Sequence, residues 1–125
     1  MISHSDLVES IFGYWPNFAD GHIELFSFEH PGIIKLRISY IDAELAKAAK
    51  ISLQFTGVHN IALSEMFDGN YLDVLSISGE SPLLVELEAC SGLQGTFACA
   101  SAEVTAVAPN PSFEADGAAA AQLKR

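Results

Sequence analysis

The sequence predicts a mainly β protein of the α+β class, with an antiparallel sheet or sandwich of six to seven strands and a short N-terminal helix. Helical spacing of apolar residues is confined to the first dozen positions. From His22 onward, short segments rich in branched and aromatic residues alternate with glycine, proline and asparagine at hairpin-like intervals. Such short connections favour antiparallel neighbours. The chain has 125 residues, and we expect one domain over residues 1–109.

The N-terminal helix is predicted over Asp6–Phe12. Ser3 or Ser5 can cap its start, and acidic residues in its early turns favour the positive end of the helix dipole. Gly13 is a natural end, because glycine adopts the left-handed conformation of a helix terminus without strain. The predicted apolar face consists of Leu7, Val8, Ile11 and Phe12.

An aromatic segment, FGYWPNFADGH, joins this helix to the first strand and is the most informative stretch of the chain. Pro16 restricts Trp15 to extended geometry, so the helix cannot continue through it. We expect Trp15, Pro16, Phe18 and Asp20 to form a structural motif in which the aromatic rings pack against the sheet and pin the helix.

Seven segments carry the β signal. The second has the clearest alternation of apolar and polar residues, which indicates one dry and one wet face. The third and fourth are separated by Gly57 and are expected to form a hairpin or bulged pair. Residues 42–50 form either a helical turn or two, or a loop. The predicted strands cover residues 23–30, 33–41, 51–56, 58–63, 71–77, 83–90 and 96–107.

The composition changes abruptly after residue 109, to proline, alanine and polar residues without alternation. We expect residues 110–125 to be a tail, and the pattern leaves open whether it is disordered or partly helical over 118–124.

Acidic residues outnumber basic ones by 16 to six, for a formal net charge of −10. Such a field repels phosphate backbones and anionic membranes, so nucleic acid and membrane are not expected partners. It favours a basic partner, although acidity also simply keeps a small apolar-rich protein in solution. No apolar run approaches the roughly 20 residues of a membrane span, and the first residues lack a secretory signal, so we expect a cytoplasmic protein.

The residues with chemical potential do not form a recognisable catalytic motif. Asp20 and His22 share a strand face and could form an acid/base or metal site with His59 or Asp68. The alternative is that Asp20 is a turn residue and His22 a structural one. Cys90 and Cys99 lack metal-ligand spacing and are interpreted as free core thiols, although the turn between them would also allow them to approach. We therefore predict no catalytic residue, metal or cofactor.

Two features are typical of a protein-binding surface. Glu86 and Glu88 project from the same face of one strand and, with Asp73 on a neighbouring strand, would form a negative stripe. The loop Glu65–Asp68 combines two acids with Met66 and Phe67, as protein interfaces often do. A solvated sheet face and an ordinary sheet-end loop are the alternative interpretations.

The order of four segments resembles the bacterial immunity protein 50 family over about residues 11 to 109. The most specific segment is WPNFADGHI, whereas the later LQFTGV and FAC pieces support it by their order. The family pattern has a histidine before the aspartate, and this chain has Ala19 there. The four segments are FGYWPNFADGHIELFSF, IKLRISY, KISLQFTGVHNIAL and GLQGTFACASAEVTAVAP.

The resemblance implies a non-catalytic protein that binds a cognate toxin of a polymorphic toxin system and blocks it. The acidity of this chain suits a basic toxin, because complementary charge speeds association. Two other functions stay open at this point. One is an orphan enzyme or small-ligand or metal binder that uses Asp20 and His22, and the other is a structural β domain.

Overall fold

The computed structural model describes residues 2–109, and the predicted tail at 110–125 lies outside these residues. The described chain is mainly β with one short helix, as predicted. It contains nine strands, more than the six to seven expected. In chain order the elements are β1 (Ile2–Ser3), α1 (Asp6–Phe12), β2 (His22–Glu29), β3 (Ile33–Asp42), β4 (Lys47–Thr56), β5 (His59–Ser64), β6 (Asn70–Gly79), β7 (Leu83–Ser91), β8 (Gln94–Cys99) and β9 (Ser101–Pro109).

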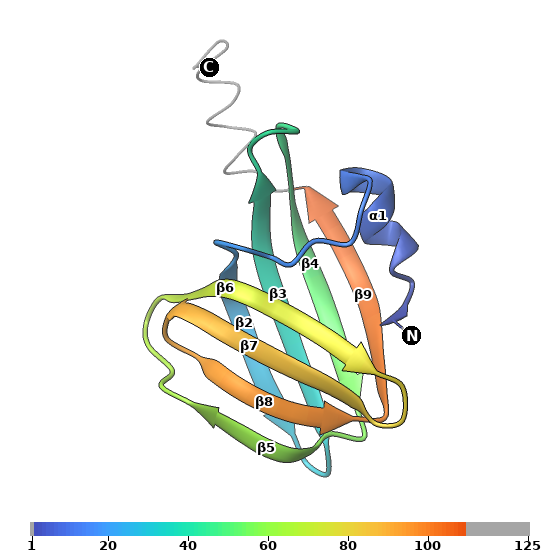
Figure 1. Ribbon diagram of the computed structural model, residues 1–125, viewed down its shortest axis with the longest axis vertical. Coiled ribbons are helices and arrows are strands. Elements are labelled where there is room, and N and C mark those ends of the chain that lie inside the picture. The colour runs from blue at the N-terminus through green and yellow to red at the C-terminus, as the bar shows by residue number, and fades with distance from the viewer. Residues whose placement is uncertain (1, 110–125) are drawn as a thin grey trace.

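The strands form one sheet that folds over itself into two layers. Its order is β1-β9-β4-β3-β2-β6-β7-β8-β5, with antiparallel pairing throughout except for the parallel pair β1–β9. Figure 1 shows β9, β4, β3 and β2 as one layer and β6, β7, β8 and β5 crossing in front of it. The two layers are joined through β2 and β6, which pair only at His22↔Tyr71 and Ile23↔Asn70.

The strands beyond the seven predicted are the short β1 and the one gained by a break in the last predicted strand. The predicted strand 96–107 is divided at Ala100, whose N–H donates to the Thr56 carbonyl, so that β8 and β9 belong to different layers. Gly57, with φ 65°, packs against Ala100 and turns the chain out of β4. The predicted pairing of the third and fourth strands is therefore wrong, because β5 pairs with β8 instead of β4.

The connection over residues 42–50 is shorter than expected, and its helical alternative is wrong. β3 and β4 pair as far as Asp42↔Lys47, which leaves only a tight turn. The Leu45 N–H donates to the Asp42 side chain, and Ala46 adopts a positive φ of 55°. Cross-strand hydrogen bonding outweighs the local helix preference of this alanine-rich segment.

The core lies between the two layers. The alternation predicted for the second strand is present in β3, and the same alternation buries one face of β4 and of β7. Phe55 of β4 and Phe97 of β8 meet edge to face across the layers, with ring centroids 5.1 Å apart. Burial of each large apolar side chain contributes roughly 1.5–3 kcal/mol. The largest fully buried side chains include Phe18, Phe55, Phe97, Ile34, Leu36, Ile38, Ile51, Leu53 and Leu72.

Helix α1 has the predicted bounds, and Gly13 ends it in the left-handed conformation with its N–H bonded to the Glu9 carbonyl. Ser5 occupies the cap position, but its φ and ψ are helical and its side chain makes no capping bond. Val8 and Phe12 are buried, whereas Leu7 is exposed and does not belong to the apolar face. The apolar face by which the short helix packs on the sheet is therefore narrower than the four-residue face predicted from the sequence.

The aromatic segment packs on the first layer through Phe18. The Phe18 ring is fully buried and contacts Trp15 and Tyr40 edge to face, at centroid distances of 5.6 and 5.4 Å. Trp15 is only partly buried. Tyr14 adds a hydrogen bond of 2.5 Å to Asp42, which raises the pKa of the Tyr14 phenol and lowers the pKa of the Asp42 carboxyl.

The end of this segment also fastens β6 to the first layer. The Leu75 N–H donates to the Asn17 carbonyl, and Asp20 and Gly21 exchange backbone hydrogen bonds with Leu72, each at 2.8 Å. Asp20 holds φ 64°, which aspartate tolerates better than most residues. The Asn17 side chain accepts from the Ala19 N–H and stabilises the turn. A motif that is contiguous in sequence thus links the two layers.

The cysteines occupy different environments, and both are free thiols. Cys99 is buried, and its burial raises the pKa of the thiol. Cys90 is exposed, so its assignment to the core is wrong. It lies on the outward-facing side of β7, in phase with Glu86 and Glu88. Within residues 2–109, no helix has the length and hydropathy of a membrane span.

Candidate functional site

The negative stripe expected from the sequence is one continuous surface in the structure. Glu86 and Glu88 project outward from β7, and Asp73 is exposed on β6, the strand that pairs with β7. All three line a shallow hollow of about 440 Å³, together with polar groups of β8 such as Gln94 and Thr96. We call Asp73, Glu86 and Glu88 the acidic face.

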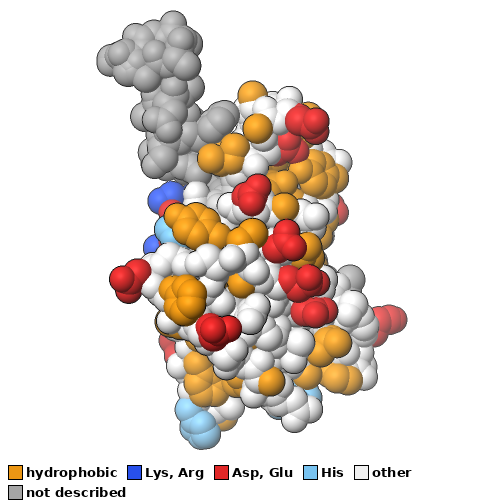
Figure 2. Space-filling model, turned by 60° about the vertical axis from the view of Figure 1, so that its left-hand side comes forward, with side chains coloured by type: hydrophobic (Ala, Val, Ile, Leu, Met, Phe, Trp, Pro, Cys, Tyr) orange, Lys and Arg blue, Asp and Glu red, His pale blue; other side chains and the backbone are white. Residues whose placement is uncertain are grey.

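Charge is distributed unevenly between the two layers. Residues 57–99, which include the whole second layer, contain six aspartates and glutamates and not a single lysine or arginine. The four lysines and arginines within the described range all lie on β3 and β4. Three of them are paired: Lys35 with Glu29, and Arg37 and Lys50 with Glu24. Figure 2 shows acidic side chains running along one face, with hydrophobic side chains between them and basic ones at its margin.

The loop Glu65–Asp68 adjoins the acidic hollow, because Gln94 in the lining of that hollow donates a hydrogen bond of 3.1 Å to the Glu65 carboxylate. Met66 and Phe67 of this loop are each more than half exposed. One side chain organises this loop. Asn70 accepts hydrogen bonds from the N–H groups of Phe67 and Leu93, at 3.0 and 2.9 Å, and donates to the Phe67 carbonyl at 2.8 Å. Asn70 is only 8% exposed and is the one buried polar residue found in the described chain. Asparagine beside glycine is common in ordinary turns, so the sequence carried no signal for this role.

We expect Asn70→Ala to lower the free energy of unfolding and to release the loop. Each buried backbone group left without a partner costs about 1–3 kcal/mol. Urea unfolding measures the change, with Asn17→Ala as the control because Asn17 is exposed and makes a single side-chain bond. If both variants lose the same free energy of unfolding, water satisfies the backbone groups of Phe67 and Leu93 that the Asn70 side chain no longer bonds.

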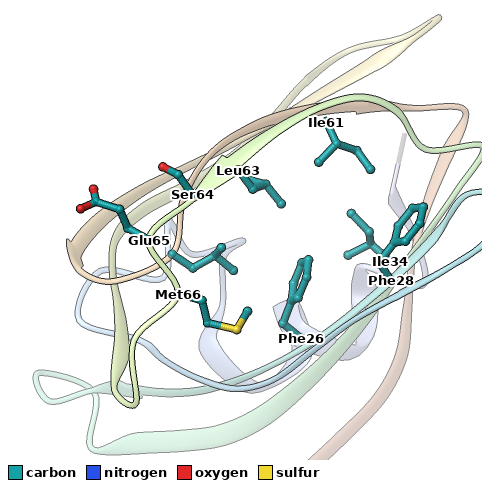
Figure 3. Close-up of a pocket in the computed structure, with 9 residues that line it drawn as sticks. Phe26, Phe28, Ile34, Ile61, Leu63, Ser64, Glu65 and Met66 are labelled. Atoms are coloured by element: carbon teal, nitrogen blue, oxygen red, sulfur yellow. The ribbon is translucent and has the colours of Figure 1, made fainter.

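A second hollow, also of about 440 Å³, is apolar and was not predicted from the sequence. Figure 3 shows Ile61 and Leu63 of β5 on one side and Phe26 and Phe28 of β2 on the other, with Met66 beside Phe26. We call this hollow the apolar groove. Glu65 lies on its rim, and Ser64 lines both the groove and the acidic hollow, so the two adjoin. Ile34 and Leu93 complete the lining.

The profile of immunity protein 50 matches residues 4–110, which is most of the chain. The chain belongs to the immunity protein 50 family. Neither the curated proteins nor the solved structures include a match to it. An immunity role is therefore supported at the level of the family. The acidic face and the apolar groove are features of this one member of the family.

In this member of the family, no hydrogen bond or ion pair among the described residues joins Asp20, His22, His59 and Asp68 to one another. Asp20 is exposed in the turn, and the His22 ring stacks on Tyr71 with centroids 4.6 Å apart. His59 bonds the Gly57 carbonyl through Nδ1. Among residues 2–109 no group of three or more histidine, cysteine or acidic side chains could hold a metal ion.

Proposed function

We propose that this immunity protein is a non-catalytic inhibitor that binds one cognate toxin of a bacterial polymorphic toxin system in the cytoplasm and blocks it. The proposed toxin is basic, and the proposed binding residues are the acidic face and the loop Glu65–Asp68. Family membership supports the immunity role. The uncompensated acidity of the second layer supports the basic partner, and it is the observation that carries the proposal.

The arrangement of charge favours recognition from one side. Glu24 and Glu29 are neutralised by neighbouring cations on the first layer. Among the described residues, no ion pair involves Asp73, Glu86 or Glu88. Their field therefore extends into solvent and attracts a cationic surface toward the second layer, which raises the association rate at low salt.

The test takes as its candidate partner a toxin encoded by a gene adjacent to the gene of this protein. We expect the immunity protein to restore growth of cells that express this toxin and to form a one-to-one complex with it. Glu86→Lys combined with Glu88→Lys should lower the association rate constant about tenfold or more at low salt, because steering is lost. Stopped-flow or surface-based kinetics measure this rate, and Glu44→Lys, an exposed acid in the turn between β3 and β4, is the control.

Two results would count against the proposal in different ways. If the protein neither binds this toxin nor restores growth, the proposed immunity function against this toxin is rejected. If the complex forms but its association rate depends neither on salt nor on the charge reversal, the immunity function stands and the acidic face is not its binding surface.

A further inference from the structure

The apolar groove lies between two strand edges that have no neighbour over much of their length. Among the described strands, β5 pairs only with β8, so its other edge is open. β2 pairs with β6 only at its first two residues, which leaves the rest of that edge open as well. Unpaired strand edges present backbone N–H and C=O groups that can pair with a further strand.

The groove exposes side chains that belong to the interior side of the sandwich. Phe28 lies directly opposite Ile34 on β3, and Ile34 is 1% exposed. Phe28 itself is 46% exposed and Ile61 is 44% exposed. The interior is therefore uncovered at this corner, where β5 diverges from β2 (Figure 3). An apolar surface of this kind, bordered by polar groups, is typical of a binding site.

Apart from one bulge, the edge of β5 lacks the devices that usually prevent a strand from pairing further. Its sequence, HNIALS, contains no lysine, no proline and no acidic residue. A bulge at Asn60, with φ 55°, interrupts its pairing between His59 and Ala62. Beyond the bulge, Ala62–Ser64 pair regularly with β8. Three regular residues with an open edge are available for a further strand.

The surroundings specify the chemistry of the occupant. The groove lining is apolar except for Ser64 and Glu65, and a volume of about 440 Å³ lies within the range of ligand pockets. Glu65 on the rim and the adjoining acidic face favour cations, and residues 57–99 contain no lysine or arginine to repel them. An extended segment whose side chains alternate between apolar and basic satisfies both surfaces at once, because alternate side chains of a strand point to opposite faces.

We propose that the partner adds an extended strand to the open edge of β5, inserts apolar side chains into the apolar groove, and places alternating lysines or arginines toward Glu65 and the acidic face. This inference rests on the proposed function and identifies the recognised element as a strand of mixed apolar and basic character. Backbone pairing contributes affinity, and the groove selects the inserted side chains.

The test is an NMR titration of the full-length, ¹⁵N-labelled protein with synthetic peptides, which requires no toxin. The probe is an acetylated peptide of alternating lysine and valine. One control peptide replaces valine by serine, and the other replaces lysine by glutamate. We expect the lysine–valine peptide alone to shift the amide resonances of Ala62–Ser64, Glu65 and Met66 in a saturable manner, and the controls to bind at least tenfold more weakly.

Ile61→Lys tests the groove itself, because a lysine there fills the hollow and repels the basic side chains. We expect it to weaken peptide binding at least tenfold. Ile41→Lys is the matched control, since Ile41 lies near the end of β3 and its exposure of 45% matches the 44% of Ile61. Ile41→Lys should change binding less than twofold. Unchanged binding in Ile61→Lys, with native amide spectra, would overturn the proposal.

Other results would also overturn it. Shifts confined to Asp73, Glu86 and Glu88 would mean that charge alone is recognised, and no shift would mean that the edge does not accept a strand. Resonances of β5 that move with protein concentration alone would assign the groove to a second copy. Contacts between residues 110–125 and Ile61 would assign it to the chain's own C-terminal segment. If the protein still neutralises the toxin while any of these results is obtained, the proposed immunity function stands and only the proposed strand addition is rejected.

Discussion

Phe55→Ala is expected to lower the free energy of unfolding by about 3–5 kcal/mol, the usual cost of deleting a buried phenylalanine ring. Phe55 is fully buried on β4, and its ring meets Phe97 of the other layer edge to face. The substitution removes this inter-layer contact and leaves a cavity in the core between two layers, whose strand pairing with each other is limited to the starts of β2 and β6. A loss of this size is a large fraction of the 5–15 kcal/mol that typically stabilises a domain.

Chemical denaturation measures this loss through the midpoint and slope of the unfolding curve. Phe28→Ala is the matched control, because it deletes the same ring from a strand position that is 46% exposed. We expect Phe28→Ala to cost clearly less than Phe55→Ala. Similar costs would show that the corner lined by Phe28 is closed in solution, and that result would also contradict the apolar groove.

Gly95→Ala is expected to detach β5 from β8. Gly95 holds φ 134°, and a Cβ atom at this position would lie 1.9 Å from the Ala62 carbonyl oxygen and 2.9 Å from the Leu63 Cα. Both neighbours are backbone atoms of β5, so the clash cannot be relieved by a side-chain rotation. The unfavourable φ alone costs about 1–3 kcal/mol, and the clash adds to this cost.

Gly13→Ala separates these two contributions. Gly13 also holds a positive φ, 84°, but nothing lies within 4 Å of the Cβ that it would acquire. The difference between the two variants in free energy of unfolding therefore reports the clash. Hydrogen exchange of the amides of Ala62–Ser64 should accelerate in Gly95→Ala and remain unchanged in Gly13→Ala. Equal destabilisation and equal exchange would contradict the close β5–β8 approach.

The part of the candidate site that depends on local pattern could be predicted. Glu86 and Glu88 lie two residues apart on a strand, and this spacing is sufficient to place both on one face. Asp73 was expected on a neighbouring strand because only a short turn separates the two segments, and β6 and β7 do pair. Exposure of Met66 and Phe67 followed from their position in a loop between two strands.

The apolar groove could not be predicted in this way. Phe26 and Phe28 alternate like core residues, and Ile61 and Leu63 do the same on β5. Whether such a face is covered depends on where a distant strand runs. β5 pairs with β8 and diverges from β2, so an interior face remains open. Asn70 is a similar case, because its partner Leu93 is 23 residues away in the chain.

The sequence by itself determined the mainly β class, the helix Asp6–Phe12 with its end at Gly13, and the face to which each alternating side chain of β3 and β7 belongs. These features follow from spacings of two to four residues, which act through local backbone geometry. The tertiary structure alone decided the break at Ala100, the pairing of β5 with β8 instead of β4, and the open corner between β5 and β2. Those features depend on contacts between residues far apart in the chain, which no local periodicity encodes.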